Sequence, residues 1–279
     1  MRSLFTGHAT RVIQRKRNFP AARKRPYLYR AMRLMRSVYA YETIEENLRK
    51  TFRRNARLFE LNEFESGQLE SLRERGYALA PAFFSRELID RVAAKTRAVF
   101  NRLEERPDPM GRMQNVPQEL AGQTIELKHP LIHISDILDL AFHESILKIS
   151  AHFLGQVPAM YRVALVRDFP GEGLAERNRF RRESGDPGSL QIMIDLADVD
   201  GASGSMVYVP GSHSSILGGL SSGPGEQEMD RVYPRSAWAA LHGERGSITS
   251  IDRRAFTRDR PGRAPETLII SRERRSAST

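Results

Sequence analysis

The sequence predicts a mainly β domain, an antiparallel barrel or sandwich behind a helical layer, preceded by a basic helical extension. Three observations support this. After Gly155, short apolar or β-prone runs alternate with turn residues. Before it, apolar residues recur at three- and four-residue steps. Charge is also uneven: residues 1–60 hold 16 Lys+Arg against 4 Asp+Glu, which leaves 28 against 30 from the totals of 44 and 34 for residues 61–279.

The N-terminal extension divides into an arm and a helix. Residues 1–26 have no acidic residue and are predicted to be a poorly ordered arm. A helical pattern then runs over 27–59, with apolar positions Leu28, Met32, Met35, Tyr39, Ile44, Leu48 and Phe52. The helix either packs an apolar stripe onto the main domain, docks on an acidic protein or an anionic membrane surface, or belongs to an organellar targeting peptide. The sequence leaves these alternatives open.

We expect a basic arm and helix over 1–68 and a main domain over 69–279. The main domain begins with a short strand, Tyr77–Leu79, and a helix with Ser85 as its N-cap. Residues 106–124 form a predicted loop. Residues 131–154 form a predicted helix ending at Gly155, with an apolar stripe of Leu138, Phe142, Ile146, Ile149 and Phe153. The predicted strands are Val163–Val166, Leu190–Leu196, Met206–Val209, Gly246–Ile251 and Thr267–Ile270.

Composition excludes several function classes. The absence of cysteine rules out disulfides, thiolate metal sites and cysteine nucleophiles. No apolar run is long enough to cross a bilayer, and no secretory signal is present, so we expect a soluble cytoplasmic protein. Nucleotide-binding glycine loops and the nucleophile elbow of hydrolases are missing. Because the main domain is close to neutral, we expect no sequence-specific nucleic-acid binding.

Four segments in order resemble one family. They are GYALAPAFFSRELID, ILKISAHFLGQVPAMYRVALVRDFPG, VDGASGSMVYVPGSH and GSITSID, spread over roughly residues 70–272. This order is similar to that of the phytanoyl-CoA dioxygenase-like branch of the Fe(II)/2-oxoglutarate oxygenases. The resemblance implies a double-stranded β-helix, or jelly roll. It also implies iron held by two histidines and one carboxylate, with an arginine clamping 2-oxoglutarate.

The residues that match this site are not the expected ones. The His-x-Asp pair corresponds to Arg181 and Glu183, the distal histidine to Thr257, and the clamping arginine to Thr267. A guanidinium stays protonated and has no lone pair for a metal, and threonine cannot form the bidentate pair of an arginine. Independently of any matching, none of the seven histidines begins a His-x-Asp. The ordinary triad cannot be assembled in its usual order.

Two interpretations of the segment at Arg181 stay open. Either Arg181 and Glu183 pair on one strand face, so that the guanidinium takes the place of the metal cation, or the segment is a surface loop with Arg177, Arg179, Arg181 and Arg182 solvated. His213 recurs in the family without binding iron, so a structural hydrogen-bonding role is predicted. Glu183 and His213 are the weak metal candidates.

The leading functional prediction is a pseudoenzyme: a non-catalytic relative, without cofactor, that serves as a binding subunit or as the partner of an active family member. The alternative is an active hydroxylase acting on a small molecule, with Fe(II) and 2-oxoglutarate at an altered metal site. A third hypothesis is a peripheral membrane or scaffold protein acting through residues 1–60.

Overall fold

A computed structural model describes residues 44–105, 124–168, 179–182, 189–199, 206–214, 223–259 and 266–273. The chain divides into two compact units, Met1–Glu46 with Ser276–Thr279, and Asn47–Arg275. The predicted arm and the first part of the predicted helix, residues 27–43, lie outside the described residues, and the division at residue 68 stays a prediction. Within the described ranges, no helix combines the length and apolar character needed to span a membrane.

The helices precede most of the barrel strands in the chain. A helix over 44–54 leads to the short 3-10 helix η2 (Ala56–Phe59). The main helices are α3 (Glu63–Arg75), α4 (Arg86–Glu105), α5 (Ile137–Ala141), α6 (Glu144–Leu154) and α7 (Glu226–Val232), with 3-10 helices η3 (Pro130–Ile132) and η5 (Arg235–Ala237). Asn62 caps α3 in a capping box with Glu65. Gly155 ends α6 in the left-handed conformation, as predicted.

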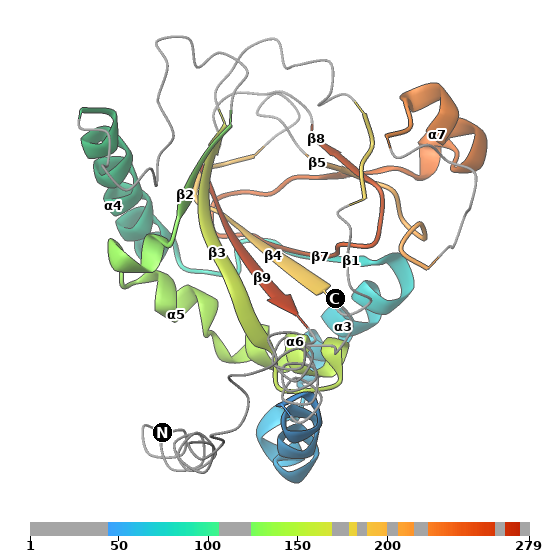
Figure 1. The fold of residues 1–279 in the computed structure, drawn as a ribbon, viewed down its shortest axis with the longest axis horizontal. Coiled ribbons are helices and arrows are strands. Elements are labelled where there is room, and N and C mark those ends of the chain that lie inside the picture. Colours follow the sequence, from blue (N-terminus) through green and yellow to red (C-terminus); the bar gives the residue numbers. More distant parts are fainter. Residues whose placement is uncertain are drawn as a thin grey trace, which may run out of the picture. The chain divides into compact units, whose positions relative to one another are not determined.

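Two antiparallel sheets form the barrel (Figure 1). The larger sheet has the order β1-β7-β4-β9-β3-β2 and the smaller one β6-β5-β8. The strands are β1 (Tyr77–Ala80), β2 (Thr124–Lys128), β3 (Ala159–Asp168), β4 (Ser189–Asp195), β5 (Met206–Tyr208), β6 (Ala239–Leu241), β7 (Ile248–Asp252), β8 (Thr257–Asp259) and β9 (Glu266–Glu273). This arrangement confirms the predicted jelly-roll fold with a helical layer.

Three apolar clusters fill the layers between these elements. The largest lies between the helices and the outer face of the large sheet, with Ile89 of α4, Leu140 of α5 and Ile192 of β4 among its buried members. A second fills the space between the sheets and includes Met193 and Tyr208. The third lies on the outer face of the small sheet, under α7. Because β4 is covered on both faces, all of its residues are buried.

Several elements of the structure differ from those predicted from the sequence. The single helix predicted over 131–154 is broken at Phe142 and His143 into α5 and α6. Leu138 and Phe142, predicted to face the core, are 43% and 48% exposed, because Ile137 and Leu140 bury α5 instead. The strands β2, β6 and β8 and the helix α7 were not predicted; β2 begins at the last residue of the predicted loop.

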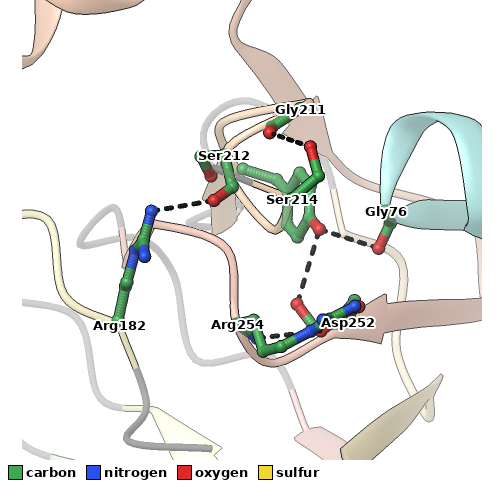
Figure 2. A network of polar contacts seen from close by, with 8 residues as sticks. Gly76, Arg182, Gly211, Ser212, Ser214, Asp252 and Arg254 are labelled. Carbon is green, nitrogen blue, oxygen red and sulfur yellow. Dashed lines mark hydrogen bonds and ion pairs between the residues drawn. The ribbon is translucent and has the colours of Figure 1, made fainter. Parts of the chain in front are cut away.

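A buried tyrosine joins the small sheet to the end of α3. The Tyr208 hydroxyl donates to the Gly76 carbonyl oxygen at 2.7 Å and lies 3.4 Å from the Asp252 carbonyl oxygen. The Asp252 backbone N–H donates to the same Gly76 oxygen at 2.8 Å. Figure 2 shows Gly76, Asp252 and Arg254 as members of one polar network. The Arg254 Nη2 donates to the Asp252 carboxylate at 2.6 Å. One carbonyl thus connects α3, β5 and β7.

We expect Tyr208→Phe to lower the free energy of unfolding by about 1 kcal/mol, since the ring stays packed and one buried hydrogen bond is lost. The measurement is urea denaturation followed by circular dichroism. Tyr77→Phe is the control, because the Tyr77 ring packs against Tyr208 but its hydroxyl has no hydrogen bond among the described contacts. Equal losses in both variants would contradict the assignment.

Candidate functional site

The structure places Arg181 and Thr257 directly opposite each other. The Arg181 N–H donates to the Thr257 carbonyl oxygen at 2.8 Å, and the Thr257 N–H donates to the Arg181 carbonyl oxygen at 2.9 Å. Directly opposed residues of an antiparallel pair project to the same face. Thr257 is buried and Arg181 is exposed. These two residues, far apart in the sequence and both matched by the resemblance to iron ligands, therefore lie opposite each other at the edge of the small sheet.

Thr267 faces a buried acid that sequence reasoning missed. On β9, Thr267 pairs with Val166 of β3 on one side and with Asp195 of β4 on the other. Asp195 shares its face of β4 with Met193, which belongs to the cluster between the sheets. Burial raises the pKa of the Asp195 carboxyl from 3.8 to about 7. A protonatable acid thus stands beside the position matched to the clamping arginine.

The residues flanking Arg181 and Thr257 point to the opposite face, under α7. Phe180 and Phe256 belong to the cluster there. The Arg182 guanidinium lies 4.3 Å from the centre of the Phe256 ring, and its Nη2 donates to the Ser212 carbonyl oxygen at 2.8 Å. Arg258 lies over the Phe180 ring and pairs with Glu226. Arg182 is therefore packed and hydrogen-bonded, which corrects its interpretation as a solvated charge, whereas Arg179 is exposed.

His213 lies in the turn after β5 and packs against Gly76. It is 9% exposed, and its Nδ1 has no hydrogen-bond partner among the described residues. A Cβ on Gly76 would lie 2.5 Å from this nitrogen, so the ring is in close contact with the backbone. Glu183 lies outside the described residues. The predicted pairing of Arg181 with Glu183 and the hydrogen-bonding role of His213 both stay predictions.

Two hollows of the described structure lie away from Arg181 and Thr257. The first, about 20 Å³, is lined by Phe64 of α3, Ile149 of α6 and Ile192 of β4 among others, on the outer face of the large sheet. It has room for about one water molecule. The second is an open hollow of about 570 Å³ beside α7, lined by Glu226, Glu228, Arg231 and Arg235 among others. Neither reaches the face that Arg181 and Thr257 share.

Comparison with known families gives one match. The profile of the phytanoyl-CoA dioxygenase family matches residues 72–256, more than half of the chain. The chain belongs to the phytanoyl-CoA dioxygenase family. The matched range runs from α3 to the residue before Thr257, so it includes β4 and the PGSH turn of His213. A comparison with curated protein sequences finds no match.

Solved structures share the fold of this phytanoyl-CoA dioxygenase family member at low sequence identity. AviO1 from Streptomyces viridochromogenes Tue57 is 19% identical, with a TM-score of 0.56 over 77% of this chain and 96% of that one. EctD from S. alaskensis, solved with 2-oxoglutarate and 5-hydroxyectoine, is 15% identical, with a TM-score of 0.59 over 75% of each chain. HygX from Streptomyces hygroscopicus, solved with nickel and 2-oxoglutarate, is 12% identical, with a TM-score of 0.54 over 77% and 87%.

The iron of the phytanoyl-CoA dioxygenase family does not fit the residues present at the matched positions. At the positions that the resemblance matches to iron ligands, Arg181 has a positive charge and no lone pair, and Thr257 has a neutral hydroxyl where the resemblance implies an imidazole. Thr267 lacks the two parallel N–H donors with which an arginine guanidinium binds a carboxylate. Among the described residues, no three His, Asp or Glu side chains lie together as a metal site would need. Because Glu183 is not among them, the predicted absence of a metal stays a prediction.

Proposed function

We propose that this protein is a member of the phytanoyl-CoA dioxygenase family that has lost iron and 2-oxoglutarate chemistry and acts as a non-catalytic partner or ligand-binding subunit. The observation that carries the proposal is the Arg181–Thr257 pair. Its backbone hydrogen bonds put the two residues side by side, and the resemblance matches both of them to iron ligands. A cation and a neutral hydroxyl at that place oppose the binding of a divalent metal.

The cosubstrate position supports the same conclusion. A 2-oxo dicarboxylate needs a positive charge at its distal carboxylate, and here Thr267 offers only a hydroxyl. Asp195 stands next to Thr267 in the strand register. Above about pH 7 its carboxyl becomes an anion and repels a second carboxylate. Arg181 and Thr257 thus disfavour the metal, and Thr267 and Asp195 disfavour the cosubstrate. A substitution that restored binding of one would leave the binding site of the other unchanged.

The experiment is anaerobic calorimetric titration of the full chain with Fe(II), with and without 2-oxoglutarate. We expect no saturable binding in either case. The reconstructed variant Arg181→His, Glu183→Asp, Thr257→His should gain Fe(II) binding near one ion per chain. It supplies the missing ligand types on a backbone that already places two of them together.

Placing the same residue types elsewhere provides the matched control. Arg86→His, Glu87→Asp and Thr51→His put two histidines and one aspartate on exposed positions of α4 and the 44–54 helix. This variant should bind no more iron than the natural chain. Stoichiometric Fe(II) binding by the natural chain, tightened by 2-oxoglutarate, would overturn the proposal and establish the alternative, an oxygenase with a rebuilt metal site.

A further inference from the structure

The segment Asn47–Phe59 is fixed to the barrel domain by an aromatic contact. The Phe52 ring lies 5.1 Å from the rings of both Phe59 and His152, in edge contact with each. His152 Nε2 lies 2.8 Å from the Phe59 carbonyl oxygen. The Val157 N–H donates to the Leu48 carbonyl oxygen at 3.4 Å. One side of this segment is therefore held against α6 and the chain that follows it.

The remaining surface of the segment is strongly basic. Asn47–Phe59 holds five arginine or lysine residues and no acidic residue. Arg53, Arg54 and Arg57 are exposed, and among the described residues no carboxylate pairs with them. Arg49 and Lys50 make other interactions, so the exposed basic surface is assigned to Arg53, Arg54 and Arg57. Three guanidinium groups on a fixed backbone favour a partner whose negative charges are closely spaced.

An exposed leucine beside these arginines decides the kind of partner. Leu58 is 66% exposed, and no residue of η2 is buried. An apolar side chain next to arginines is typical of segments that lie in the headgroup layer of a membrane, where both find suitable surroundings. A nucleic acid offers phosphates to the arginines but little to an exposed leucine. The combination favours lipid over nucleic acid.

We propose that Asn47–Phe59 is a docking surface for an anionic lipid bilayer. Arg53, Arg54 and Arg57 bind headgroup phosphates and carboxylates, and Leu58 enters the boundary between headgroups and acyl chains. The fixed contact with His152 then holds the barrel domain at the membrane surface, beyond any role of the barrel itself. This surface belongs to described residues of the barrel unit and does not depend on residues 1–43.

The experiment is co-sedimentation of the full chain with phosphatidylcholine vesicles, with and without phosphatidylserine. The variant Arg53→Gln, Arg54→Gln, Arg57→Gln should bind the phosphatidylserine vesicles about a hundredfold more weakly, since each basic residue near an anionic surface contributes about fivefold. The matched control, Arg86→Gln, Arg97→Gln, Arg231→Gln, removes the same charge from exposed positions of α4 and α7. It should keep most of the affinity.

Leu58→Ser separates lipid from other polyanions. We expect a loss of roughly tenfold on phosphatidylserine vesicles and no change on a DNA duplex of equal charge concentration. Equal losses in the two triple variants would mean attraction by net charge alone and would overturn the proposal. So would vesicle binding that survives the Arg53, Arg54 and Arg57 changes, or a loss confined to the duplex. Unchanged circular dichroism spectra and melting temperatures exclude misfolding as the cause.

Discussion

Gly76→Ala should lower the free energy of unfolding by roughly 3–5 kcal/mol, combining overpacking, a left-handed backbone and a lost hydrogen bond. Gly76 has a φ of +81°, and a Cβ there would overlap the Tyr208 hydroxyl and lie 2.5 Å from His213 Nδ1. Tyr208 is fully buried and cannot move aside. Urea denaturation followed by circular dichroism measures the loss.

Gly155→Ala is the control for the backbone conformation alone. Gly155 has a φ of +69°, but no atom lies within 4 Å of its Cβ position. We expect a loss of about 1–2 kcal/mol there. The double variant Gly76→Ala, Tyr208→Phe should recover part of the stability, since it removes the overlapping oxygen. Equal losses at Gly76 and Gly155 would show that the steric argument is wrong.

The contribution of Asp195 to the stability of the folded chain should fall as pH rises from about 4 to about 7, because Asp195 keeps its proton in the fold to a higher pH than in the unfolded chain. Burial raises the folded pKa from 3.8 to about 7. The folded state therefore binds more protons than the unfolded state between these values. The contribution of Asp195 to the free energy of unfolding is complete below about pH 4 and lost above about pH 7. It amounts to at most about 4 kcal/mol.

Asp195→Asn removes the titrating group with little change in shape. We expect its urea midpoint to exceed that of the natural chain at about pH 8 and this advantage to disappear by about pH 4. Asp139→Asn, on an exposed position of α5, is the matched control for the substitution itself. A wild-type profile that Asp195→Asn does not alter would contradict the burial argument.

Strands covered on both faces could be predicted from the sequence, and short ones could not. The run Leu190–Leu196 is apolar because β4 is buried on both sides. The three-residue strands β6 and β8 carry no periodic signal, and their hydrogen bonds to β5 define them. Leu138 and Phe142 have helical spacing in the sequence, but the break at His143 turns them outward. Spacing alone does not reveal such a break.

The candidate site could be predicted from the sequence only in part. The resemblance matched Arg181 and Thr257 to two separate iron ligands, and the structure shows them opposite each other, a contact that the sequence analysis did not state. Asp195 was missed because it ends an apolar run and was counted with it. Alternation along β4 carried the signal: Gln191, Met193 and Asp195 share one face, so two polar residues point between the sheets. Burial of Asp195, which perturbs its pKa, depends on the folded chain.

The two hydrogen bonds described between Arg181 and Thr257 join main-chain atoms. Their strength is therefore independent of the side chains at these two positions, because every residue type except proline offers the same N–H and C=O groups. Under the proposed function, this backbone pairing is the part of the metal site that is kept although neither side chain is a metal ligand. If the proposed function holds, the fold of this barrel and the chemistry of its site are set by different atoms, the main chain for the first and the side chains for the second.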